Sequence, residues 1–115
     1  MIPAFDPFTG QLPPGEHEAT WTEIRNRFGW NQRRRELLSG MREGLTVLAR
    51  AGCTRVWING SFVTTKAEPG DFDCVWAAAN VDRALLDRVA PEILDLSGHR
   101  RRQHARFCGE FFPDI

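Results

Sequence analysis

Residues 54–77 read TRVWINGSFVTTKAEPGDFDCVWA, and the fold prediction starts from this segment. It contains two short apolar runs, residues 54–59 and 72–77, rich in the β-branched and aromatic side chains typical of strands. Residues 60–70 between them begin and end with glycine and contain Pro69, which indicates a loop. The segment therefore predicts two strands joined by a loop, with a helical turn starting at Ser61.

Helical periodicity surrounds the two predicted strands. Residues 31–52, NQRRRELLSGMREGLTVLARAG, repeat apolar side chains at steps of three and four positions, which is typical of an amphipathic helix. Gly40 and Gly44 lie four residues apart in it and indicate a face that another element approaches closely. Further helices are predicted over residues 20–28, 81–90 and 91–98, with Asn80 capping the second of these.

The two ends of the chain differ in character. Residues 1–19 carry prolines and glycines that block helices and strands, which predicts an irregular arm anchored by Phe5, Phe8 and Leu12. Near the other end, the basic segment HRRRQHAR leads into a third predicted strand over residues 106–112.

Length and composition indicate one domain of the α/β (α+β) class, residues 1–115, with helices packed on a short mixed sheet. Fifteen basic and fifteen acidic residues give no net charge, which excludes a polybasic nucleic-acid coat. Cys53, Cys74 and Cys108 lack the spacing of a disulfide framework or a zinc site. No targeting or membrane segment is recognisable, so we expect a cytoplasmic protein with no membrane partner.

The residues with the clearest chemical potential flank the predicted loop. Strand side chains alternate, so Asp71 and Asp73 are expected on one face of the sheet. Two close carboxylates favour a cation, and oxygen ligands suit Mg²⁺ or Mn²⁺, which also bind phosphate. Gly60 allows close approach of the backbone to a ligand, and Ser61 adds a hydroxyl. The alternative interpretation is that the aspartates only cap the turn before the strand.

The order Gly60-Ser61, a spacer, and Asp71-Phe72-Asp73 resembles the nucleotidyltransferase superfamily. The pieces IPAFDPFTGQLPPGEH, GSFVTTKAEPGDFD and GEFFP also resemble short bacterial and phage proteins described as nucleotidyltransferase-like, over nearly the whole chain. The resemblance implies phosphate binding by Gly60 and Ser61 and metal binding by Asp71 and Asp73. It further implies a triphosphate contact from Lys66 and a third carboxylate from Glu110.

The resemblance implies a metal-dependent transfer of a nucleotide from a nucleoside triphosphate to an RNA, such as tRNA, or to a protein. A toxin–antitoxin or phage-defence setting would fit. The alternative is an inactive module of the same fold that binds a partner protein, as an antitoxin or phage-encoded inhibitor. The arginine clusters at residues 33–35 and 100–102 are either solvated helix faces or phosphate contacts. The second, flanked by His99 and His104, is expected to reach the rim of the Glu110 site.

Overall fold

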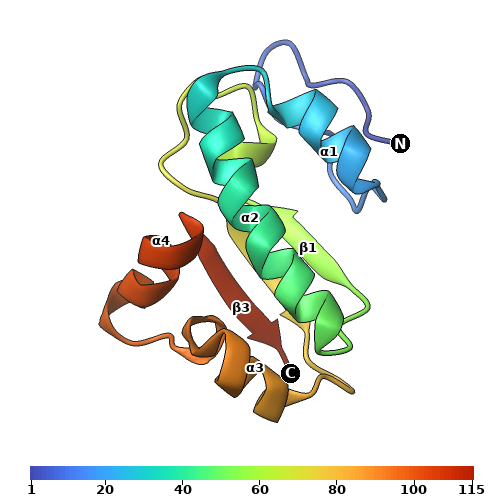
Figure 1. The fold of residues 1–115 in the computed structure, drawn as a ribbon. Coiled ribbons are helices and arrows are strands. Elements are labelled where there is room, and N and C mark those ends of the chain that lie inside the picture. Colours follow the sequence, from blue (N-terminus) through green and yellow to red (C-terminus); the bar gives the residue numbers. More distant parts are fainter.

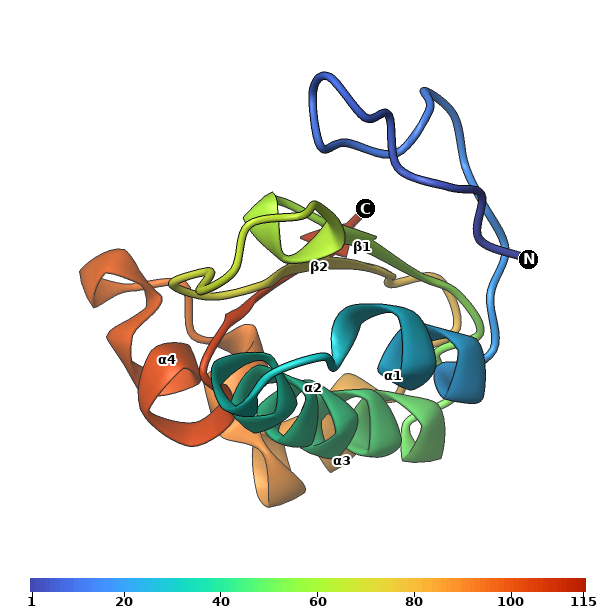
Figure 2. The ribbon, with the colours of Figure 1, turned by 90° about the horizontal axis from the view of Figure 1, so that it is seen from above.

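A layer of helices covers one face of a three-stranded sheet in the computed structural model, which describes residues 1–115 (Figures 1 and 2). This confirms the predicted fold class. No helix combines the length and hydropathy needed to span a lipid bilayer. The elements are α1 (Trp21–Phe28), α2 (Gln32–Arg50), β1 (Val56–Asn59), the 3-10 turn η1 (Ser61–Val63), β2 (Asp73–Ala77), α3 (Arg83–Val89), the 3-10 turns η2 (Pro91–Leu94) and η3 (Gly98–Arg100), α4 (Arg101–Phe107) and β3 (Glu110–Asp114).

The sheet is mixed, as predicted, with the strand order β1-β2-β3. β1 pairs antiparallel with β2, and β2 pairs parallel with β3. The register places Asn59 opposite Asp73, and Asp73 opposite Glu110. Since side chains alternate along each strand, this polar row lies on the face opposite to the buried Cys74 and Phe111. The helices cover the other, apolar face (Figure 2).

The core lies between α2 and the inner face of the sheet. Trp76 and Phe111 are fully buried there. The close approach predicted from two glycines of α2 is confirmed. A β-carbon at Gly40 would collide with the carbonyl oxygen of Phe107, and one at Gly44 would collide with the Phe111 ring. These glycines let α2 pack directly against the chain entering β3.

Two of the predicted helix details are wrong. α3 is capped by Asp82, whose carboxylate accepts a hydrogen bond from the Leu85 N–H at 3.0 Å, while Asn80 lies in the preceding turn with φ of 65°. The helix predicted over residues 91–98 is limited to the η2 turn. Asp95 ends it, because its carboxylate accepts hydrogen bonds from the backbone and hydroxyl of Ser97 and so favours a turn.

The third strand starts later than predicted. Residues 106 and 107 still belong to α4, and Cys108 leaves this helix in the left-handed conformation, with φ of 64°. β3 then runs from Glu110 to Asp114 instead of over residues 106–112. The left-handed cap explains the error, because apolar Phe107 and Cys108 resemble strand residues in sequence but are the last residue of α4 and its C-cap.

The arm packs on the domain through some of its apolar residues, as predicted. The Phe5 ring meets that of Phe28 edge-on, with centroids 6.0 Å apart, and Leu12 is partly buried against the core. Phe8 was wrongly predicted as an anchor, since its side chain is 96% exposed. The Asp6 carboxylate accepts backbone hydrogen bonds at 2.7 and 3.2 Å within this turn and fixes Phe8 at its outer tip.

Candidate functional site

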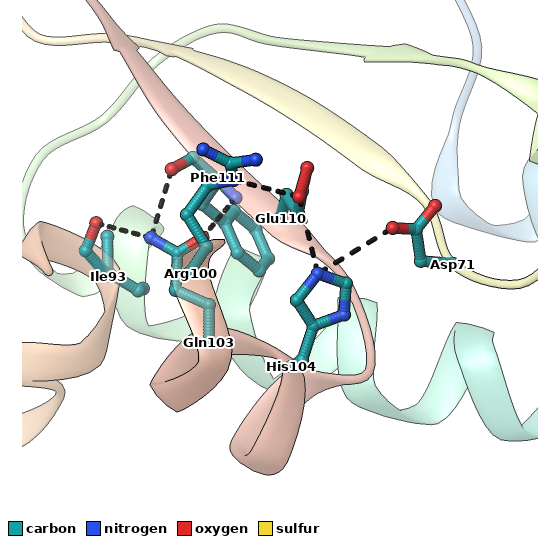
Figure 3. Close-up of polar contacts among 7 residues, drawn as sticks. All are labelled: Asp71, Ile93, Arg100, Gln103, His104, Glu110 and Phe111. Atoms are coloured by element: carbon teal, nitrogen blue, oxygen red, sulfur yellow. Dashed lines mark hydrogen bonds and ion pairs between the residues drawn. The ribbon is translucent and has the colours of Figure 1, made fainter. Parts of the chain in front are cut away.

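Asp71, His104 and Glu110 meet beside the start of β3 (Figure 3). Their nearest ligand atoms all lie within 4.8 Å of one another. His104 Nε2 is 3.3 Å from Glu110 Oε1 and 3.7 Å from Asp71 Oδ2. One imidazole nitrogen and two carboxylates therefore form a possible metal-binding triad, and all three side chains remain partly accessible to solvent.

The position of His104 depends on its neighbour in α4, Gln103. The buried Gln103 amide donates hydrogen bonds to the carbonyl oxygens of Ile93 and Phe111 at 3.1 Å. Its oxygen accepts the Phe111 N–H at 2.8 Å, which ties α4 to β3 (Figure 3). Because Gln103 precedes His104 and Phe111 follows Glu110, these bonds set the distance between the imidazole and the carboxylate.

The basic segment at residues 99–106 reaches this site, as the sequence predicted. Arg100 Nε donates to Glu110 Oε1 at 2.8 Å, and the side chain points at the same carboxylate as His104 (Figure 3). Burial alone would raise the pKa of Glu110, but the hydrogen bonds from Arg100 and His104 outweigh it and lower this pKa. Glu110 is therefore ionised and already has cationic or hydrogen-bonding partners.

The pKa values of the other two carboxyl groups, those of Asp71 and Asp73, are raised and not lowered. Burial, followed by the negative charges of Asp71 and Glu110, raises the pKa of Asp73 to about 6. Burial and Glu110 also raise the pKa of Asp71. Burial is the larger cause of both shifts, and His104, Arg33 and Arg100 oppose the shift at Asp71. The three neighbouring carboxyl groups nevertheless repel one another, which is a condition under which a cation is attracted.

The closest ligand set differs from the predicted one. His104 was not assigned to metal from the sequence, yet it stands with Asp71 and Glu110. Asp73 lies opposite Glu110 on the neighbouring strand. The only sequence signal for His104 was its position six residues before Glu110, and this becomes informative only once the left-handed turn between them is known.

The predicted phosphate-binding residues are only partly near the carboxylates. A β-carbon at Gly60, where φ is 88°, would lie 2.7 Å from Asp73 Oδ2, so glycine meets both a conformational and a steric need there. Ser61 follows directly and makes no side-chain hydrogen bond, while Lys66 is exposed and has no ion pair. Gly60, Ser61 and Lys66 line a cleft that the three carboxylates do not line.

A comparison with models of protein families shows to which family the chain belongs. Residues 3–114 match a family of unknown function, DUF6932. The chain belongs to this family. No curated protein and no solved structure matches it. Because the description of DUF6932 names no activity, its function has to be argued from the site itself.

The loop that leads to the site in this DUF6932 protein is held by the start of α2. Arg34 is fully buried, and burial lowers its pKa to about 10, so it stays charged at neutral pH. Arg34 makes no ion pair and donates instead to the carbonyl oxygens of Phe28, Phe62, Thr64 and Lys66. Arg33 holds the carbonyl oxygens of Pro69 and Gly70, and Asn31 holds that of Ala67.

The arginine cluster at residues 33–35 was interpreted from the sequence as a solvated helix face or as a set of phosphate contacts, and the buried Arg34 fits neither interpretation. Arg34 also stacks on Trp30, with its guanidinium carbon 3.7 Å from the ring centroid. Its side chain is thus an internal support for the loop, neither solvated nor free to bind RNA phosphate. A run of arginines at a helix start carries no signal of this kind, because the partners are backbone carbonyl groups far away in sequence.

Proposed function

We propose that the protein is a metal-dependent nucleotidyltransferase, which joins a nucleoside monophosphate to an acceptor hydroxyl and releases pyrophosphate. The observation that carries the proposal is the meeting of Asp71, His104 and Glu110 next to Asp73 and Gly60. Attack on a triphosphate requires a cation that neutralises its oxygens and the charge that builds up on pyrophosphate. The excess of carboxyl groups supports cation binding at this point.

The donor set favours Mn²⁺ among the ions expected from the sequence. Mg²⁺ prefers oxygen ligands and retains its water, whereas Mn²⁺ also accepts imidazole nitrogen. Asp71 and Glu110 would each give an oxygen and His104 a nitrogen, which leaves positions for phosphate oxygens. His104 must be neutral to bind the ion, so the affinity should fall in acid.

The residues around the ion have complementary roles in the proposal. The phosphates would approach the backbone at Gly60, the Ser61 hydroxyl and the Lys66 ammonium group, all of which lack competing side-chain partners. Glu110, expected to activate the acceptor, is occupied by Arg100. Asp73, with its raised pKa, is better suited to accept the proton from the attacking hydroxyl.

The acceptor in this proposal is an RNA, such as tRNA, or a protein hydroxyl, in a toxin–antitoxin or phage-defence pair. Arg101 is exposed, forms no ion pair and lies next to Arg100, so it offers a contact for an acceptor phosphate. Arg102 is less suited, because it pairs with Asp95 at 3.0 Å.

One observation favours a second candidate, the inactive partner-binding module. The Arg100 guanidinium, 2.8 Å from Glu110, already supplies a positive charge where an ion would bind. A domain that had lost its metal could keep the carboxylate in place through this pair. The two candidates differ in whether a divalent ion binds at all.

Label transfer tests the proposed activity. The protein is incubated with each of the four α-³²P-labelled nucleoside triphosphates, Mn²⁺ or Mg²⁺, and total RNA or cell protein, and the products are separated on gels. We expect labelled RNA or protein with wild type and with Asp87→Asn, an exposed position on α3, but not with Asp71→Asn or His104→Ala. Absence of transfer together with absence of Mn²⁺ binding by calorimetry would favour the inactive module.

A further inference from the structure

The outer edge of β1 is free, because β1 has β2 as its only neighbour in the sheet. The Ala77 N–H donates to the Arg55 carbonyl oxygen at 3.0 Å, so this antiparallel pair is a hydrogen-bonded one. Such pairs alternate along a ladder, so Trp57 bonds to β2, while Val56 and Ile58 direct their N–H and C=O groups away from it. No hydrogen bond outside the sheet involves these outward groups.

A cleft of about 1600 Å³ opens beside this edge, between β1, α1 and the arm. The arm is fastened at two points, one after the end of β1 and one at Trp57 within the strand. Its Gly10 carbonyl oxygen accepts the Thr65 N–H at 2.9 Å, and its Glu16 accepts the Trp57 indole N–H at 2.9 Å. In Figure 2 most of the arm lies above the strands, on the side away from the helices. The arm therefore lines the cleft beside the free edge, and it pairs with the chain only after β1, in the isolated bridge between Gln11 and Thr64.

The chemistry of the cleft suits a peptide better than a nucleic acid. Its lining includes the partly or fully buried apolar side chains of Ile24, Phe28, Val56, Ile58 and Val63. Its charges are largely matched within the protein, since Glu16 pairs with Arg55 and Glu23 with the N-terminal amine, both at 3.5 Å. The lining also contains Glu18 and Lys66, which have opposite charges. Along β1, a nucleic-acid backbone would find no matching excess of positive charge, because Lys66 is the one unpaired cationic side chain of the lining and is already assigned to the triphosphate.

We propose that this cleft binds an extended segment of a partner protein as an added strand on β1. The N–H and C=O groups of Val56 and Ile58 would pair with the backbone of that segment, as in other cases of strand addition. Alternate side chains of the segment would enter the apolar lining, so the ligand is an uncharged stretch with apolar residues at every second position. The inference stands on the β1 edge and does not depend on nucleotidyl transfer, although the proposed phosphate contacts Gly60, Ser61 and Lys66 line another part of the same cleft.

Peptide selection tests the proposal with the full chain. A phage library of random 12-residue peptides is selected on the protein, and the enriched peptides are synthesised and measured by fluorescence anisotropy. We expect peptides with alternating apolar residues, and slower hydrogen exchange at the Val56 and Ile58 amides when they bind. Ile58→Pro should weaken binding at least tenfold, because it removes an outward N–H, whereas Ile58→Val keeps this group.

A second measurement covers the case in which the proline variant misfolds. Two versions of the peptide are made, one with N-methyl groups on the odd-numbered residues and one with them on the even-numbered residues. Only one of the two sets of N–H groups faces β1, so one version should lose binding and the other should bind unchanged. The proposal would be overturned if both N-methylated versions lost binding equally, or if binding slowed hydrogen exchange at amides other than those of Val56 and Ile58. It would also be overturned if the selection enriched no peptide. So would competition by ATP with Mn²⁺ for these amides, which would assign the cleft to the nucleotide.

Discussion

Replacing Asp73 with asparagine tests whether the carboxyl cluster is under electrostatic strain. Burial and two neighbouring carboxylates raise the pKa of Asp73 from 3.8 to about 6. The folded protein therefore binds this proton more tightly than the unfolded chain, and stability falls as the pH rises from about 4 to about 6. The difference corresponds to at most about 3 kcal/mol, and since Asp73 retains contact with water, we expect about 1 kcal/mol.

Asparagine keeps the shape of Asp73 and removes the charge, so Asp73→Asn should be about 1 kcal/mol more stable than wild type at pH 7 and equal to it at pH 4. Urea unfolding followed by tryptophan fluorescence at both pH values measures this. Asp87→Asn on α3 is the control, with changes below about 0.5 kcal/mol.

Divalent ions supply the second part of the same test. If Asp73 contributes charge to the ion site, Mn²⁺ should raise the melting temperature of Asp73→Asn less than that of wild type. A variant that is about 1 kcal/mol less stable at pH 7, with an unchanged Mn²⁺ effect, would show instead that Asp73 is a turn or cap residue. That result would refute the electrostatic reasoning.

Three further predictions concern packing and are measured by urea unfolding. Arg34→Met should cost about 3 to 5 kcal/mol, because buried carbonyl groups lose their donor, and a cost below about 1 kcal/mol would contradict the support role. Gly40→Ala should cost about 3 kcal/mol through its collision with Phe107, and a neutral result would mean that α2 can shift. Phe8→Ser should change stability by less than about 0.5 kcal/mol, whereas Phe5→Ala should cost about 1 to 2 kcal/mol, and equal costs would argue against the exposed turn.

The part of the fold that follows from local periodicity was predictable. The strands containing Val56 and Trp76, the long helix α2 and the glycines Gly40 and Gly44 all depend on side chains that repeat at two, three or four positions. The mixed sheet was predicted as well. The two strands, the helix and its glycines are visible in sequence because the residues that decide them are close together in the chain.

The site was predictable only in part, because it depends on contacts between distant segments. His104 reaches Glu110 through a left-handed turn at Cys108, and Gln103 holds that arrangement through the backbone of β3. The support of the loop by Arg34 uses carbonyl oxygens, which every residue has. Neither kind of contact leaves a pattern in the spacing of residue types.

The buried Arg34 and the carboxyl groups at the end of the loop are not paired with one another. Arg34 lies buried beneath the loop without a carboxylate partner, while the carboxyl groups of Asp71, Asp73 and Glu110 lie at its end, near Arg100. His104 and Arg33 also act on Asp71 and oppose the rise of its pKa. A chain shaped for stability alone would pair these charges, because both arrangements are costly. Here the loop carbonyls take up the positive charge of Arg34, so it is not available to the carboxyl groups. At the end of the loop, burial raises the pKa values of Asp71 and Asp73, and the neighbouring carboxylates add to this effect. Cation binding is the proposed use that would relieve this cost.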